Sequence, residues 1–129
     1  MAPALNHTIV LCSDKKVSAG YLADILGLPQ AEPFGPFLVV ELDNGVSLDF
    51  HDHWDPGAEI ESQHYAFLVS EDEFDAVFGR IEGRGQEYWA DPGLSRRGEL
   101  NHNDGGRGCY FRDPDGHLLE ILTRPYGSG

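Results

Sequence analysis

The sequence predicts an α+β fold built from two similar modules, and three observations lead to that prediction. Short runs of aliphatic and β-branched residues predict strands, and two amphipathic segments predict helices. The order strand, helix, strand, hairpin occurs twice, with module one at about 4–54 and module two at about 61–124. A chain of 129 residues suits one domain, so we expect both modules to form a single domain over 1–129.

Module one opens with LNHTIVLC (5–12), whose β-branched and aliphatic residues predict a strand. A helix is expected next, with Ser13 as its N-cap and Gly27 at its C-terminal end. The apolar positions of this helix recur at helical spacing and are Val17, Tyr21, Leu22, Ile25 and Leu28. The stretch FLVVELDNGVSLDFHDH (37–53) then predicts a hairpin that turns at its Asn-Gly pair.

Module two repeats this order. SQHYAFLVS (62–70) predicts a strand, and Ser70 with Glu73 has the spacing of a capping box at a helix start. The expected apolar face of that helix consists of Phe74, Val77, Phe78 and Ile81. QEYWA (86–90) predicts a short strand, and GCYFRDPDGHLLEILT (108–123) predicts a hairpin with a Pro-Asp-Gly turn.

The charge and cysteine content limit the partners and the compartment. The chain carries 22 acidic and 9 basic residues, for a formal net charge of -13, so a nucleic-acid or anionic membrane partner is not expected. Apolar runs such as FLVV (37–40) are too short to span a membrane, and the first residues lack a signal-peptide pattern. Cys12 and Cys109 are interpreted as buried thiols in a reducing environment, which predicts a cytoplasmic protein.

The two modules align in their polar strand residues. Each has a histidine early in its first strand, His7 or His64, and a carboxylate four residues after the glycine of its hairpin turn, Asp49 or Glu120. A strand histidine alone is more often a structural residue than a ligand, but four residues at matching places favour a shared function. A carboxylate in an apolar strand is costly unless a charge pairs with it. A divalent cation shared with two imidazoles would provide that charge.

The predicted site therefore holds one divalent metal ion, ligated by His7, His64 and Glu120, with Asp49 as an additional candidate. Imidazole and carboxylate ligands suit Fe, Mn, Ni, Co or Zn, and the sequence leaves the choice among them open. Asp49 has the alternative role of a residue that lines the cavity without touching the metal.

The stretch YFRDPDGHLLEI (110–121) resembles the final hairpin of the vicinal oxygen chelate superfamily, and LNHTIVL and QHYAFLVS resemble its two ligand-bearing strands. This superfamily includes glyoxalase I, extradiol dioxygenases, fosfomycin-resistance thiol transferases and bleomycin resistance proteins. The resemblance implies paired βαβββ modules whose mixed sheet curls into a cup around one metal. It assigns His7, His64 and Glu120 to the ligand positions.

The resemblance also implies roles outside the ligand set. Asp49 falls where glyoxalase I has a fourth ligand, a glutamate, and Tyr110 falls where the fosfomycin enzymes have a substrate-contacting tyrosine. An ordinary strand aromatic is the alternative for Tyr110. In the glyoxalase and fosfomycin relatives the partner module comes from a second chain. We therefore expect a small-molecule substrate and a homodimer with shared sites, and the short linker 55–61 favours such exchange.

Three enzyme types remain open. A glyoxalase-type lyase needs basic residues for its thiol tripeptide, and the candidates are Arg96, Arg97 and Arg107. A dioxygenase needs an acid–base histidine, and the candidates are His51, His53 and His102. A fosfomycin-type transferase is less favoured, because Ile9 stands where that family has a threonine. A drug-sequestering protein without catalysis is the alternative outside the enzymes.

The glycine-rich segment 91–108 is the main difference in length between the modules. Its glycines predict mobility, and it leads directly into the ligand hairpin, so one interpretation is a flap over the site. A plain surface loop is the alternative. HDHWD (51–55) is a further candidate for lining the site, and a separate metal site within it is disfavoured because its side chains alternate.

Overall fold

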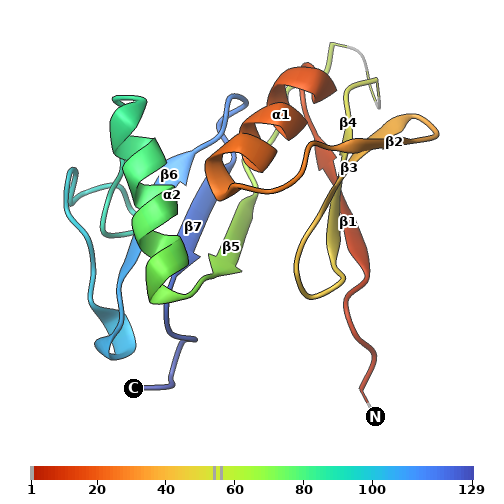
Figure 1. Cartoon of the computed structure of the whole chain (residues 1–129). Coiled ribbons are helices and arrows are strands. Elements are labelled where there is room, and N and C mark those ends of the chain that lie inside the picture. Colours follow the sequence, from red (N-terminus) through yellow and green to blue (C-terminus); the bar gives the residue numbers. More distant parts are fainter. Residues whose placement is uncertain (1, 54, 56) are drawn as a thin grey trace. The chain divides into compact units, whose positions relative to one another are not determined.

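The computed structural model describes residues 2–53, 55 and 57–129, and the chain forms two compact units, Met1–Ile60 and Glu61–Gly129. Each unit combines a mixed β-sheet with one α-helix among its described residues, which confirms the α+β class and the two modules (Figure 1). Trp54 of the HDHWD stretch and Pro56 of the linker lie outside the described residues.

Unit 1 contains a four-stranded sheet in the order β1-β4-β3-β2. Its elements are β1 (His7–Leu11), α1 (Lys15–Leu26), β2 (Glu32–Phe34), β3 (Phe37–Glu41) and β4 (Ser47–His51). β1 runs parallel to β4, and the other neighbours are antiparallel. The last strand of the unit therefore lies in the interior of the sheet, between the first strand and the hairpin partner.

Helix α1 begins one residue later than predicted. Asp14, not Ser13, is the N-cap, because its carboxylate accepts hydrogen bonds from the backbone of Lys16 at 2.9 Å and of Val17 at 3.3 Å. Gly27 ends the helix in the left-handed conformation, at φ 69°, as predicted. The predicted apolar face is partly wrong, since Val17 is 54% exposed. Small residues take its place in the buried face, which consists of Ser18, Ala19, Leu22, Ala23 and Ile25.

Strand β2 is not predicted by the sequence pattern. It is three residues long and carries Pro33, which lacks a backbone N–H and is tolerated because β2 is the edge of the sheet. A proline within a short polar run reads as a loop in a sequence. The pairing of β2 with β3 is what makes it a strand.

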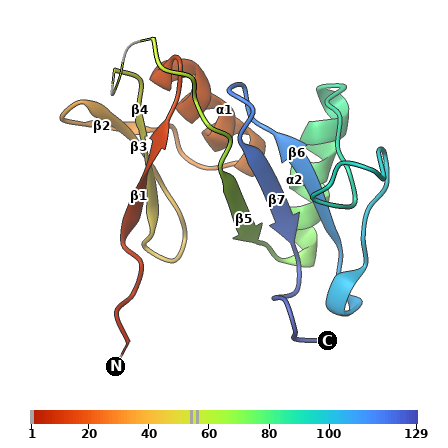
Figure 2. The same ribbon diagram turned by 180° about the vertical axis from the view of Figure 1, so that it is seen from behind.

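Unit 2 contains a three-stranded sheet in the order β5-β7-β6, with β7 in the centre. Its elements are β5 (His64–Leu68), α2 (Glu71–Gly83), the 3-10 helix η1 (Asn103–Gly105), β6 (Gly108–Arg112) and β7 (Leu118–Leu122). The predicted capping box is confirmed, because Ser70 accepts from the backbone N–H of Glu73 at 3.1 Å and Glu73 accepts from that of Ser70 at 2.9 Å. Figures 1 and 2 show α2 on one face of this sheet.

The strand predicted over 86–90 is not formed. Only Trp89 pairs with β6, through two backbone hydrogen bonds with Tyr110 of 2.9 and 2.8 Å. The chain then turns, because the carboxylate of Asp91 accepts hydrogen bonds from the backbone N–H groups of Ser95 at 3.0 Å and Arg96 at 2.8 Å. Across this turn, the backbone of Ala90 donates to Arg96 and that of Gly98 donates to Tyr88.

Hydrogen bonds tie part of the segment 91–108 to its neighbours, and its role as a flap stays a prediction. Asn101 is 6% exposed, its amide donates to the carbonyl of Ala90 at 2.8 Å, and its backbone pairs with Gly108. A Cβ on Gly108 would lie 3.0 Å from the Asn101 side chain. Gly108 therefore permits a close approach and is not evidence of mobility.

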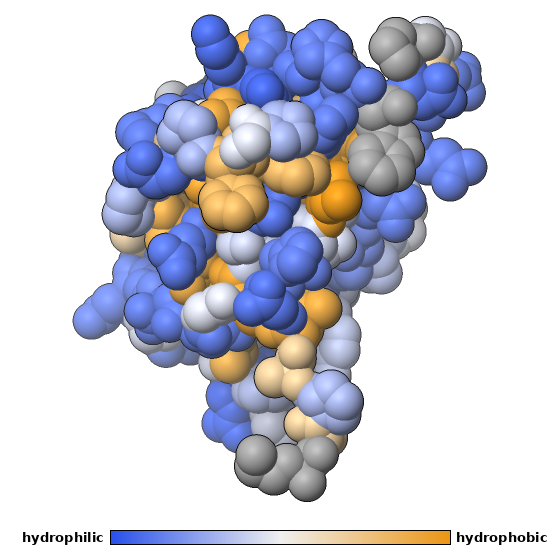
Figure 3. Space-filling view, turned by 90° about the vertical axis from the view of Figure 1, so that its right-hand side faces the viewer, coloured by the Kyte–Doolittle hydropathy of each residue, from blue (hydrophilic) through white to orange (hydrophobic). Residues whose placement is uncertain are grey.

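Strands β4 and β5 each have one buried face and one more exposed face, whereas Tyr110 and Glu120 in β6 and β7 are buried on the His64 side of their sheet. Along β4, Leu48 and Phe50 are buried while Ser47, Asp49 and His51 are partly exposed, as predicted from strand alternation. Hydrophobic residues also reach the surface in small patches between hydrophilic ones on the side shown in Figure 3. None of the described helices has the length and apolar character needed to cross a bilayer.

Candidate metal centre

Parallel pairing of the first and last strands of unit 2 brings His64 and Glu120 together. His64 pairs with Leu118 and Ala66 pairs with Glu120, so both side chains lie on the same face of the sheet, the one on which β5 is exposed. The Nε2 atom of His64 lies 3.1 Å from Oε1 of Glu120. The Glu120 side chain is 1% exposed and that of His64 is 45% exposed, so the pair joins a buried charge to an accessible imidazole.

The hydrogen bond at Nδ1 of His64 determines whether Nε2 acts as a donor or as an acceptor. Nδ1 lies 2.9 Å from the carbonyl oxygen of Leu118, which only accepts, so Nδ1 carries a proton. In a neutral ring, Nε2 is then a lone pair facing a carboxylate oxygen. The Nε2 lone pair and the carboxylate oxygen repel each other unless a cation lies between them. That cation is either a second proton on the ring or a metal ion.

Two tyrosines cover Glu120. The Tyr126 hydroxyl lies 2.7 Å from Oε1 and 2.6 Å from Oε2 of Glu120, and it donates to the carboxylate. The Tyr110 hydroxyl lies 3.0 Å from that of Tyr126, and its ring stacks on His64 with 5.8 Å between centroids. Desolvation raises the pKa of Tyr126, as do its hydrogen bonds to Glu120 and Tyr110, so the phenol stays protonated.

Unit 1 repeats half of this arrangement. His7 pairs with Ser47 and Ile9 pairs with Asp49, so histidine and carboxylate are again two residues apart along parallel neighbours. Nδ1 of His7 lies 2.6 Å from Oδ1 of Asn6, which leaves Nε2 as the nitrogen with a lone pair. Oδ1 of Asp49 accepts a hydrogen bond from the Ser47 hydroxyl at 2.8 Å.

The His64–Glu120 pair fits two ligands of one ion. Neighbouring ligands that each lie about 2.1 Å from a metal are about 3.0 Å apart at a right angle, and the observed separation is 3.1 Å. Among the described residues of either unit, three or more histidine, cysteine or acidic side chains do not gather at one place. His64 and Glu120 alone would not complete the ligand set of a metal ion.

Comparison with known proteins identifies the family. Residues 4–121 match the Glyoxalase/Bleomycin resistance protein/Dioxygenase superfamily. The chain belongs to this superfamily. The resemblance inferred from the final hairpin is therefore confirmed, and so is the paired βαβββ type of fold.

Two oxidases of known structure are similar to this superfamily member along their whole length. Oxidase ChaP-H2 is 64% identical, with a TM-score of 0.94 over 100% of this chain and 99% of its own. Oxidase ChaP-H1 is 61% identical, with a TM-score of 0.93 over 98% of this chain and 99% of its own. The glutathione transferase FosA of Serratia marcescens is 32% identical over 124 residues, which are 94% of this chain and 81% of the transferase.

Of the additional residues predicted for the superfamily site, Tyr110 lies beside the His64–Glu120 pair and Arg107 does not. The Arg107 guanidinium lies over the Phe74 ring at 4.4 Å and pairs with Glu71 at 2.7 Å and Asp75 at 2.8 Å. These contacts tie the start of β6 to α2 and occupy the guanidinium. A substrate role for Arg107 is therefore not supported by its position.

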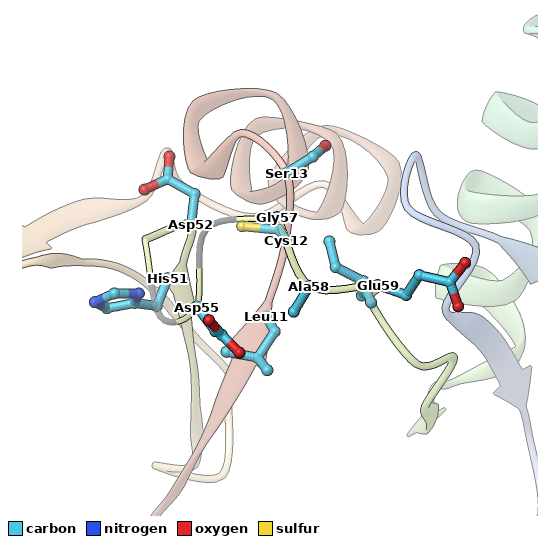
Figure 4. A pocket seen from close by; sticks show the side chains of 10 residues that line it. Leu11, Cys12, Ser13, His51, Asp52, Asp55, Gly57, Ala58 and Glu59 are labelled. Carbon is cyan, nitrogen blue, oxygen red and sulfur yellow. The ribbon is translucent and has the colours of Figure 1, made fainter.

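His51 and His102 are the remaining predicted residues. His51 ends β4, packs its ring edge-on against Phe37 at 5.3 Å, and lines a pocket of about 260 Å³ in unit 1 (Figure 4). His102 precedes η1, and its Nδ1 lies 3.2 Å from the carbonyl oxygen of Gly106. Both side chains thus have local structural contacts, and their substrate roles stay predictions.

Asp52, the middle residue of the HDH stretch (51–53), has a structural role at the start of helix α1. Its Oδ2 accepts a hydrogen bond from the backbone N–H of Lys15 at 3.0 Å, at the first turn of α1. That bond lowers the pKa of Asp52. A carboxylate at this place also complements the positive end of the helix dipole.

Tyr126 is the site residue that sequence reasoning missed. It lies in the tail RPYGSG, after the last predicted element, where a tyrosine between proline and glycine resembles an ordinary loop residue. A hydroxyl-bearing aromatic within a few residues of a ligand strand is the signal that could have pointed to it.

Proposed function

We propose that the protein is a metal-dependent oxidase of the superfamily that acts on a small substrate with adjacent oxygen atoms. Two features support the oxidase assignment over the other enzyme types. ChaP-H1 and ChaP-H2 are named oxidases, and their 61% and 64% identity extends over nearly the whole of both chains. The His64–Glu120 pair supplies two donors of the ligand set expected for the superfamily.

The observation that carries the metal assignment is the contact between His64 Nε2 and Glu120 Oε1 at 3.1 Å. Glu120 is buried in an apolar strand, and a buried carboxylate without a compensating charge is costly. The Leu118 carbonyl holds the imidazole in the tautomer that turns a lone pair toward that carboxylate. A divalent ion would satisfy both groups at once.

His7 is proposed as the third ligand, and Asp49 as a residue near the ion. His7 and His64 each stand at the first pair of a parallel strand pairing, and Asp49 and Glu120 each stand at the third pair. Since Asp49 is one methylene shorter than glutamate and already accepts from Ser47, we propose it as a residue that lines the site. The ion is Fe, Mn, Ni, Co or Zn, and its choice is left to measurement.

A bound divalent ion supplies Lewis acidity, which withdraws electron density from substrate oxygens bound next to each other. The chain's residues have complementary tasks. His64 and Glu120 would hold the ion, and the half-exposed His64 imidazole would leave it accessible to a substrate. Tyr110, stacked on His64, presents its ring and hydroxyl beside the same pair. A homodimer with shared sites would bring the module faces together, as the family resemblance implies.

The alternatives have weaker support. FosA is a glutathione transferase with 32% identity, about half the identity of the ChaP-H oxidases. Ile9 lacks the hydroxyl that the fosfomycin type needs at that position. Sequestration without catalysis would not require a histidine tautomer aimed at a buried carboxylate.

Metal analysis combined with oxygen uptake tests the proposal. The purified protein is stripped with a chelator, reloaded separately with Fe(II), Mn(II), Co(II), Ni(II) and Zn(II), and assayed for oxygen uptake on catechols and hydroquinones. We expect one ion per chain and metal-dependent oxygen uptake. Glu120→Gln should lose the metal and the activity, while Glu82→Gln, on the exposed side of α2, should keep both.

Other results would redirect the assignment. Isomerisation of a hemithioacetal without oxygen uptake would indicate a glyoxalase-type lyase. Wild-type protein that retains no metal under any loading condition would remove the metal-dependent proposal and favour sequestration.

A further inference from the structure

The last residues of the described chain bring a hydroxyl to Glu120 from outside the sheet. After β7 the chain leaves the sheet, and Figure 1 shows this tail continuing beyond the end of that strand. Tyr126 is 62% exposed as a residue, yet its hydroxyl reaches both oxygens of a side chain that is 1% exposed. The Tyr126 hydroxyl thus contacts the carboxylate group of Glu120 directly.

The tail is fixed by its own hydrogen bonds. The Ser128 hydroxyl donates to the carbonyl of Pro125 at 2.6 Å, and the Arg124 guanidinium donates to the carbonyl of Ser128 at 3.0 Å. The backbone N–H of Gly129 donates to the Asp104 carboxylate at 3.2 Å, which ties the tail to η1. These bonds surround Tyr126 on both sides in the sequence, so its position is set by a closed tail structure.

The distances show how the hydroxyl acts on the carboxylate. A donor that lies 2.7 Å from one oxygen and 2.6 Å from the other lies midway between them and resists rotation of the carboxylate group. The terminal torsion of a glutamate is otherwise broad, with little intrinsic preference. The Tyr126 oxygen can also accept from Tyr110, which lies 3.0 Å away, so the donor direction of Tyr126 is fixed as well.

We infer that Tyr126 is a positioning residue that holds the Glu120 carboxylate with Oε1 directed at His64, and so sets the affinity of the metal site. This inference rests on the proposed metal site and adds to it a residue outside the ligand set. Partners that orient a ligand typically change metal affinity about 10- to 100-fold when they are removed. Tyr126 acts through Glu120 and is not proposed as a ligand itself.

Tyr126→Phe tests the inference, because it removes one oxygen and keeps the ring. Co(II) is the probe, since its visible absorption reports the ligand geometry without any substrate or turnover. We expect Co(II) affinity, measured by competition with a chelator, to fall about 10- to 100-fold. The Co(II) bands should shift in position and intensity, while the melting temperature of the metal-free protein stays close to that of the wild type.

Tyr65→Phe is the matched control. Tyr65 follows His64 in β5 and faces the side of the sheet that α2 covers, so the same loss of one hydroxyl should leave Co(II) affinity and spectrum unchanged. Equal Co(II) affinity and spectrum in Tyr126→Phe and wild type would overturn the positioning role and leave the metal site standing. Wild-type protein that binds no Co(II) would overturn both.

Discussion

Asp49 and Glu120 occupy the same position in their two sheets. Each pairs with the third residue of the parallel first strand of its unit, and the first residue of that strand is a histidine, His7 or His64. Each unit thus displays one histidine and one carboxylate at equivalent places. In unit 2 the histidine and the carboxylate are in direct contact, because Nε2 of His64 lies 3.1 Å from Oε1 of Glu120.

This equivalence leads to a prediction about assembly. If a site takes His7 from one chain and His64 with Glu120 from the other, a His7→Ala chain and a Glu120→Ala chain should complement each other. Each variant alone should bind no metal. Their heterodimer should bind one ion, because one shared site receives both substitutions and the other receives neither.

Differently tagged chains and metal analysis of the purified heterodimer provide the measurement. A heterodimer without metal would show that His7 and Glu120 of the same chain serve the same site. The wild-type dimer, purified with the same tags, sets the level expected for two ions.

Asn101 provides a test of the folded loop. Its amide is buried and bonded to Ala90, so Asn101→Ala leaves a carbonyl without its donor and should lower the free energy of unfolding by about 1–3 kcal/mol. Asn103→Ala, on the exposed side of the same loop, should change it by less than about 0.5 kcal/mol. Urea unfolding measures both, and equal stability of the two variants would show that the Asn101–Ala90 contact does not stabilise the loop.

The capping box of α2 predicts a pH effect on stability. The Ser70 backbone N–H, followed by its hydroxyl, lowers the pKa of Glu73 below the usual value for glutamate. The stabilisation is therefore present above that usual value, about 4.3, and is lost as the pH falls through the lowered pKa of the folded state. Glu73→Ala should cost about 0.5–1 kcal/mol at pH 7 and less in acid.

Urea unfolding at neutral and acidic pH compares this variant with Asp72→Ala. Asp72 lies in the same first turn, but the capping box is formed by Ser70 and Glu73. A pH-independent cost of Glu73→Ala would contradict the charge-assisted cap.

Cys109 should be inert in the folded protein. Burial, together with the nearby charge of Glu120, raises the pKa of its thiol to about 12, and the residue is 0% exposed. In a Cys12→Ser background, a thiol reagent such as DTNB should not react at pH 8 until guanidinium unfolds the chain. Rapid reaction with the native protein would show that β6 opens locally.

Much of the fold could be predicted from the sequence because the signals are local. Asn44-Gly45 marks a hairpin, Ser70 and Glu73 mark a helix start, and Gly27 marks a helix end. His64 and Glu120 could be predicted because the repeat aligned them and because strands alternate their side chains. Their ligand role remains a prediction.

The predictions fail where side-chain contacts, and not local sequence patterns, determine the structure. QEYWA has strand-forming residues, yet the side chain of Asp91 turns the chain after one backbone pair. Gly108 has a packing role that its residue type does not reveal, because a Cβ there would lie 3.0 Å from the Asn101 side chain. The contact of Tyr126 with Glu120 depends on how the tail after β7 folds. Periodic sequence patterns do not predict that fold.

The central position of β7 also has a consequence for how the protein is made. His64 and Glu120 are 56 residues apart, and β5 and β6 each pair with β7, which lies between them. During synthesis, the edges of β5 and β6 that face β7 therefore stay unpaired until β7 has left the ribosome. Closing such a distant pair is a slow step in folding. The carboxylate and the imidazole then meet in the same event that completes the sheet, so a half-made chain offers metal ions no preformed pair.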